Sequence, residues 1–186
     1  MRKTLVIIPY PSFLKDDVDK VKRLYKARAG ADCDVLMIDS KGKGWVQVQN
    51  ETVQANFEGY THFVYTCMDY FPGRDYLALA LMAMTEFKAG LVGFNDGKWH
   101  GKNATAGLVS KEFILNNYPS KTMFHTGYKF HGADPDLTEC AMRKNKYVYC
   151  PAAVMIEVDY EKDFRSNKMD IDQKLYYARE HRGFDL

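Results

Sequence analysis

The sequence has 186 residues, of which 46% are hydrophobic and 14% aromatic, and its 26 basic and 24 acidic residues give a net charge of +2. This composition excludes collagen-like, disordered and small disulfide-scaffold proteins, and it supplies enough apolar residues for the core of one domain. The balanced charge disfavours a dedicated nucleic-acid-binding domain, but it leaves a weakly bound polynucleotide open as a partner.

The first apolar run, Leu5 to Ile8, follows Met1-Arg2-Lys3 and so resembles the start of a signal peptide. Pro9 and Pro11 interrupt it, no small-residue cleavage site follows, and it is far shorter than the ~20 residues that cross a bilayer. We therefore expect a buried first strand, with no signal peptide and no membrane span.

Apolar runs and helical spacing alternate over the first half of the chain. Strands are predicted at 4–9, 34–39, 61–66 and 91–95. Helices are predicted between them at 16–29, 45–57 and 75–88, with a turn at Pro72-Gly73 before the third helix. This order predicts a mainly parallel sheet with crossover helices on its faces.

The pattern changes after Asp96. Residues 97–101 read as a loop, 105–109 as a short strand and 111–117 as a helix. Asp134 and Pro135 open another helix, with Asp134 suited to the N-cap and Pro135 to the first helical position. Two strands, 147–150 and 153–159, are predicted near the end, and the whole chain reads as one α/β domain.

The four cysteines show neither CxxC nor zinc-ligand spacing; they are Cys33, Cys67, Cys140 and Cys150. Reduced, mostly buried thiols are expected from such spacing. They are typical of an intracellular protein, so a cytoplasmic location is predicted.

Polar residues follow each of the first four predicted strands, and ligands of open α/β sheets bind beyond these ends. They are Tyr10 and Ser12, then Asp39, then Asp69, then Asn95 and Asp96. Pro9-Tyr10-Pro11 stands where a glycine-rich phosphate loop would follow the first strand, which disfavours Rossmann dehydrogenases and P-loop kinases. A nucleotide diphosphate would therefore need a divalent cation, and a carboxylate such as Asp69 suits Mg²⁺ or Mn²⁺.

Several short blocks, taken in order, resemble the GT-A glycosyltransferases, family-two-like members in particular. The blocks are Leu5-Val6-Ile7-Ile8-Pro9, Asp39, Tyr60 to Asp69, Gly93 to Trp99, Ala104 to Ile114, and Gly132 to Leu137. The resemblance implies a single GT-A-like nucleotide-diphospho-sugar transferase domain over 1–186. Residues 1–96 would form its nucleotide-sugar-binding half and 97–186 its acceptor-binding half.

The resemblance also implies roles for individual residues. Donor-binding residues would be Pro9, Tyr10, Asp39, Cys67, Met68 and Asp69. Asp69 matches the last, metal-binding acid of the family's DxD motif, whereas Cys67 replaces its first acid. Asp134 matches the catalytic base, although Ala133 replaces the glutamate before it. Glu157 stands where many relatives carry a metal-binding histidine, and Asn95, Asp96, Trp99 and His100 would bind the acceptor.

The activity so implied is that of a glycosyltransferase of the hexosyltransferase class. It would be metal-dependent, using Mn²⁺ or Mg²⁺, and inverting, and it would move a sugar from a UDP-sugar to a hydroxyl of a glycan or glycoprotein. Near-neutral charge favours such an acceptor over a nucleic acid. Similar small domains occur in viral and phage genomes, in which case the location would be the host cytoplasm.

Each of four of these residues also has a purely structural explanation. Asp39 can cap a loop, Asp134 can cap a helix, Trp99 can fold back onto the core and Glu157 can face solvent on an edge strand. Two other functions also remain open: a sugar nucleotidyltransferase, whose glycine-rich basic signature is missing after the first strand, and a non-catalytic nucleotide- or carbohydrate-binding domain.

Overall fold

A seven-stranded sheet forms the centre of the computed structural model, which describes residues 3–158 and 169–185. Its strands are β1 Thr4–Tyr10, β2 Cys33–Asp39, β3 His62–Tyr65, β4 Tyr70–Pro72, β5 Leu91–Asn95, β6 Gly107–Ser110 and β7 Tyr147–Glu157. Their order across the sheet is β2-β1-β3-β6-β5-β7-β4.

The sheet is mixed but mainly parallel. β1 pairs in parallel with β2 and β3, and β5 pairs in parallel with β7. β6 lies between β3 and β5 and runs antiparallel to both, while β4 runs antiparallel to β7 at one edge. The predicted fold class is confirmed, with two antiparallel strands inserted into the parallel arrangement.

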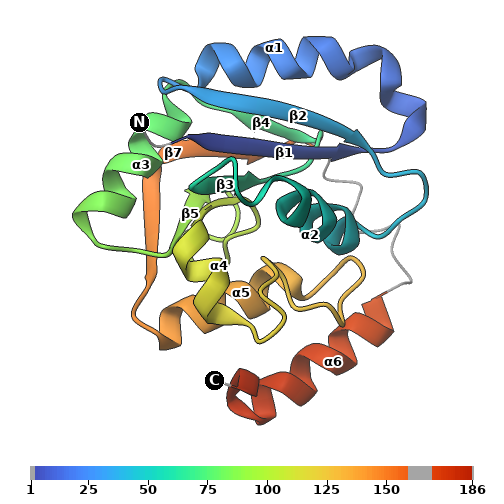
Figure 1. Cartoon of the computed structure of the whole chain (residues 1–186), viewed down its shortest axis with the longest axis vertical. Coiled ribbons are helices and arrows are strands. Elements are labelled where there is room, and N and C mark those ends of the chain that lie inside the picture. The colour runs from blue at the N-terminus through green and yellow to red at the C-terminus, as the bar shows by residue number, and fades with distance from the viewer. Residues whose placement is uncertain (1–2, 159–168, 186) are drawn as a thin grey trace.

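Helices cover both faces of the sheet (Figure 1). They are α1 Val18–Arg28, α2 Trp45–Asn56, α3 Tyr76–Glu86, α4 Lys111–Asn117, α5 Ala133–Arg143 and α6 Met169–His181, with short 3-10 helices at Ser12–Asp17 and Gly183–Asp185. None of the helices in the described ranges has the length and apolarity that a bilayer crossing requires.

The side-chain alternation of β1 separates two apolar cores. Leu5 and Ile7 pack with residues of α2, α4 and α5, whereas Val6 and Ile8 pack with residues of α1 and α3. A strand whose successive side chains are apolar on both faces must be buried on both, as parallel strands between helical layers are. α6 lies outside α5, and its residue Leu175 packs against the first of these cores (Figure 1).

Three local predictions were wrong. The N-cap of α5 is Gly132, with a φ of 77°, and Asp134 is the second helical residue. The two strands expected near the end are one strand, β7, whose register against β5 shifts beyond Cys150, since Phe94 pairs with Cys150 and Asn95 with Val154. The segment expected only to turn at Pro72-Gly73 first forms β4.

Candidate active site

A cavity of about 440 Å³ opens where β1, β2 and β3 end. Its lining consists of Pro9, Tyr10, Pro11, Phe13, Leu14, Ser40, Lys43, Trp45, Cys67, Met68, Asp69 and Phe130. Five of the six residues predicted to bind a donor are among them, and Asp39 is the exception. A hollow therefore lies where open α/β sheets bind their ligands.

A larger groove, of about 730 Å³, lies beside this cavity between α2 and residues 122–130. Lys43 and Phe130 line both the groove and the cavity. The groove contains none of the residues predicted to act in chemistry. The cavity at the strand ends is therefore the better candidate for the active site.

Asp39 lies at the rim of the cavity, at the end of β2. Its Oδ1 accepts hydrogen bonds from Ser12 Oγ at 2.7 Å and from the backbone N of Lys41 at 3.0 Å. The bond from Ser12, followed by that from Lys41, holds the pKa of Asp39 below its usual value. The carboxylate thus joins the loops after β1 and β2, and its contact with a base or ribose stays a prediction.

Cys67, Met68 and Asp69 form the connection between β3 and β4. The phenol of Tyr25 on α1 donates a hydrogen bond to the carbonyl oxygen of Tyr70 at 3.0 Å, directly after this connection. Burial raises the pKa of Tyr25 far above its usual value, and the nearby Cys67 and Asp69 raise it further. The phenol therefore keeps its proton and supports the connection from the α1 side.

The antiparallel ladder of β4 and β7 brings Glu157 close to Asp69 along the backbone. Tyr70 pairs with Glu157, and the backbone N of Val158 donates to the carbonyl oxygen of Asp69 at 2.9 Å. β4 pairs with this part of β7 on one side, the pairing of β7 with β5 ends at Val154, and Glu157 is half-buried. In the described ranges, no group of three or more His, Cys, Asp or Glu side chains is placed to hold a metal ion.

Tyr70 is the first residue of β4; it directly follows Asp69 and pairs with Glu157 of β7. Its side chain is buried, and burial raises the pKa of the phenol far above its usual value. Cys67, Glu157 and Asp134 raise this pKa further, and Glu157 is the direct partner of Tyr70 across the ladder of β4 and β7. Tyr70 therefore stays protonated beside Glu157, one of the two predicted metal ligands.

Asp134 is half-buried in the first turn of α5. Its Oδ2 accepts a hydrogen bond from Nδ2 of Asn103 at 2.9 Å, so the carboxylate is oriented by a neutral amide and does not cap the helix. Its charge also contributes, after burial, to the raised pKa of Tyr65 on β3. Asn103 directly precedes Ala104, whose carbonyl oxygen accepts a hydrogen bond from the phenol of Tyr65, the last residue of β3, at 2.7 Å. Asp134 therefore lies at the same end of the sheet as the connection between β3 and β4.

Asp96, predicted to contact an acceptor, is buried and engaged within its own loop. Its Oδ1 accepts hydrogen bonds from the backbone N of Lys98 and of Trp99, both at 2.9 Å. Its Oδ2 accepts one from Thr105 Oγ1 at 2.7 Å. These contacts shape the loop after β5, so any effect of Asp96 on an acceptor would pass through that loop.

Trp99 and His100 are exposed on this loop, with 43% of Trp99 accessible. The interpretation in which Trp99 folds back onto the core is therefore wrong. Asn95 donates from Nδ2 to the carbonyl oxygen of Pro151 at 3.0 Å and thereby joins the loop to β7. The indole and the imidazole are therefore open to an acceptor, as is the neighbouring exposed side chain of Lys98.

The comparisons with known proteins bear on the fold. No protein-family model matches the sequence, and no curated protein does. The structure is similar to S. aureus TarS 1-349 (TM-score 0.56, 11% identity, 88% of this chain and 62% of TarS 1-349). It is also similar to TarS 1-349 in complex with UDP-GlcNAc (TM-score 0.54, 11% identity, 89% of this chain and 61% of that one). The chain thus spans about three fifths of the TarS portion that it matches.

A third similar structure is a glycosyltransferase involved in the glycosylation of the major capsid of PBCV-1 (TM-score 0.53, 10% identity). This match covers 95% of the chain and 100% of that glycosyltransferase. The chain has the GT-A fold. At these identities the likeness shows the architecture alone, and the activity must be argued from the site.

Sequence reasoning missed several residues that this GT-A fold brings to the site. Phe13, Trp45 and Phe130 line the cavity with Tyr10 and give it an aromatic wall. Phe13 is 81% exposed, and an exposed phenylalanine at the mouth of a cavity is a recognisable signal of ligand contact. Phe130 is also exposed at the cavity, but it comes from a loop that only the tertiary fold brings there.

Proposed function

We propose that the protein is an inverting, metal-dependent glycosyltransferase that uses a nucleotide-diphosphate sugar, with a UDP-sugar as the favoured donor. The acceptor is a hydroxyl of a glycan or glycoprotein. One observation carries the proposal: the predicted donor residues gather around one cavity in a chain whose fold is shared with TarS in complex with UDP-GlcNAc.

The cavity suits a nucleotide in size and lining. Its volume of about 440 Å³ is within the range of small-ligand sites. Tyr10, Phe13, Trp45 and Phe130 offer ring faces for stacking a base, and each base stacked on an aromatic ring typically gains ~1–3 kcal/mol. Lys43 also lines the cavity, and its Nζ pairs with Oε2 of Glu51 at 2.7 Å, so an anionic donor would compete with Glu51 for this ammonium group.

Asp134 is the proposed general base. A carboxylate that is half-buried, and held by Asn103 at 2.9 Å, has a fixed orientation from which to take the proton of an acceptor hydroxyl. The deprotonating hydroxyl then attacks the anomeric carbon from the face opposite the leaving diphosphate. Such a single displacement inverts the configuration at that carbon.

Asp69 and Glu157 are the proposed ligands of Mn²⁺ or Mg²⁺. Two carboxylates completed by substrate phosphate oxygens are a common arrangement for Mg²⁺, and it fits a site without three protein ligands. When bound, the cation would supply Lewis-acid stabilisation of the departing diphosphate.

A thermal-shift screen of nucleotide-sugars with and without Mn²⁺ tests donor binding. A ligand that binds only the folded state raises stability by RT ln(1 + [L]/Kd), which is about 2.7 kcal/mol at a concentration of 100 Kd. UDP-sugars with Mn²⁺ are expected to give the largest rise. No shift with any nucleotide-sugar would contradict the proposal.

Turnover of the donor in the presence of Mn²⁺ then separates an enzyme from a binding domain. Asp134→Asn should lower kcat by about 10²- to 10⁴-fold and leave donor binding intact, as expected for loss of a general base. Asp19→Asn, which changes an exposed carboxylate on α1, is the matched control and should be neutral. If Asp69→Ala leaves metal-dependent turnover unchanged, the metal assignment is wrong.

A further inference from the structure

One carboxylate on α6 holds three consecutive backbone amides of a distant segment. Oδ1 of Asp172 accepts a hydrogen bond from the N of Lys129 at 3.1 Å, and Oδ2 accepts from the N of Phe130 and of His131, both at 2.9 Å. Asp172 is only 2% exposed. A buried carboxylate is costly unless it is hydrogen-bonded, so these amides account for its presence there.

The segment that Asp172 holds contributes to the donor cavity. Phe130 lines that cavity and is 37% exposed. The carbonyl oxygen of Lys129 accepts a hydrogen bond from the N of Val46 at 3.2 Å, at the start of α2. A Cβ at position 44 would come within 2.6 Å of the same oxygen, so this close approach requires Gly44. The segment is therefore fixed against α2 on one side and against Asp172 on the other.

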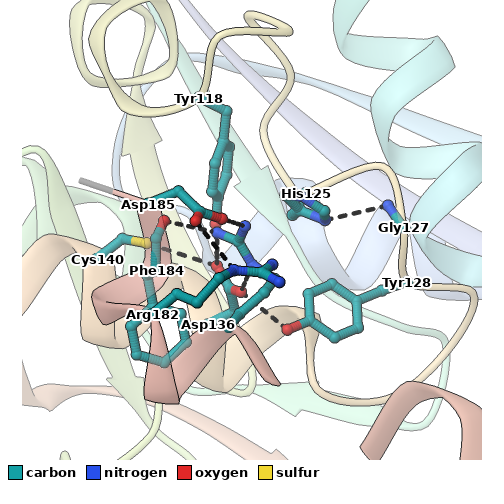
Figure 2. Close-up of polar contacts among 10 residues, drawn as sticks. Tyr118, His125, Gly127, Tyr128, Asp136, Cys140, Arg182, Phe184 and Asp185 are labelled. Carbon is teal, nitrogen blue, oxygen red and sulfur yellow. Dashed lines mark hydrogen bonds and ion pairs between the residues drawn. The ribbon is translucent and has the colours of Figure 1, made fainter. Parts of the chain in front are cut away.

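α6 is itself fastened to α5 by a second buried contact. Nε of Arg179 donates to Oδ2 of Asp136 at 2.5 Å, and both side chains are almost completely buried. Tyr118 and Tyr128 donate their phenol protons to Oδ1 and Oδ2 of Asp136, each at 2.8 Å (Figure 2). Tyr128 directly precedes the segment at 129–131. Asp172 near the start of α6 therefore holds this segment directly, and Arg179 near the end of α6 holds the residue before it through Asp136.

We propose that Asp172 is a positioning residue for nucleotide binding, because it fixes Phe130 as the wall of the cavity against which the donor base stacks. This rests on the proposed function, since it takes the cavity to be the donor site. The ligand moiety concerned is the aromatic base of a nucleoside diphosphate.

Two measurements on Asp172→Asn test the proposal. The amide group cannot accept from all three N–H groups, so hydrogen exchange of the 129–131 amides in the ligand-free protein should become faster. Calorimetric titration with UDP and Mn²⁺ should show binding weaker by about tenfold, within the range for loss of a base-stacking ring. Asp172→Glu, which keeps the charge but displaces its oxygens, is the second variant and should give the same two effects.

Phe130→Ala decides whether Asp172 acts through the ring. This single change should weaken UDP binding by the same factor, and Asp172→Asn combined with Phe130→Ala should weaken it no further. Asp185→Asn is the matched control, because Asp185 lies just beyond α6 and its carboxylate accepts hydrogen bonds from Arg179 at 2.8 Å and Arg182 at 3.2 Å, not from the segment at 129–131. It should leave UDP affinity unchanged.

The outcomes separate the two proposals. Faster exchange with unchanged UDP affinity, or losses that multiply in the double variant, would overturn the positioning role while donor binding stands. Wild-type protein that binds no UDP would refute the proposed function and, with it, the role of Asp172 in nucleotide binding. Unchanged exchange in both Asp172 variants would overturn it.

Discussion

Breaking the buried ion pair between Arg179 and Asp136 should destabilise the fold more than the substitution of any exposed charged residue. In Arg179→Met the carboxylate of Asp136, fully buried, would lose its positive partner while retaining the two phenol donors. Removing one partner of a buried pair typically costs about 3–5 kcal/mol. For a chain of this size that corresponds to a fall in Tm of roughly 10 °C.

Equilibrium unfolding in guanidinium chloride, followed by circular dichroism, measures this cost. Arg182→Met is the matched control, because Arg182 is exposed and its contact with Asp185, at 3.2 Å, is a surface one; it should change stability by less than about 1 kcal/mol. In a double-mutant cycle, adding Asp136→Asn should recover part of the loss, since the uncompensated charge is then gone. Equal costs for Arg179→Met and Arg182→Met would refute the reasoning.

Three further predictions concern single side chains. Asn103→Ala should lower kcat about tenfold with little change in donor KM, because it frees the carboxylate of Asp134; steady-state kinetics measures this. Burial lowers the pKa of His125, whose Nδ1 accepts from the N of Gly127 at 3.1 Å. Neutral His125 thus stabilises the fold above its unfolded pKa of ~6.5, and this stability is lost as pH falls through the lower folded pKa. Thermal unfolding from pH 7.5 to 5 should show that loss, and His125→Asn should reduce it. Ser110→Ala should cost about 1 kcal/mol in denaturant unfolding, because it removes the N-cap of α4.

The sequence predicted the local elements well because their signals are local. β-branched runs, helical spacing and turn residues identified β1, β2, β3 and β5 and the helices up to α5. Strand pairing is a property of the tertiary structure, so the place of β6 between β3 and β5 was not predictable. There, a Cβ at position 107 would come within 2.8 Å of the phenol of Tyr65, a contact that only the folded sheet reveals. β4, with three residues, is too short to give a pattern.

The residues of the candidate site also fall into two groups, those that the sequence pattern predicts and those that only the tertiary structure places there. Tyr10 and Asp69 were predictable because parallel strands end on the same side of a sheet, so residues that follow those strands must gather. Phe130 and Asp172 come from segments far along the chain whose sequence shows only ordinary loop and helix residues. Their part in the cavity depends on long-range contacts, which periodicity does not encode.

The cysteines differ in a way that is useful in practice. Cys33, Cys140 and Cys150 are buried, whereas Cys67 is half-buried and lines the cavity. A thiol-directed reagent added to the folded protein should therefore alkylate Cys67 first. Its rate of labelling then provides an optical readout of whether a small molecule fills the hollow, without a radioactive substrate or a known acceptor.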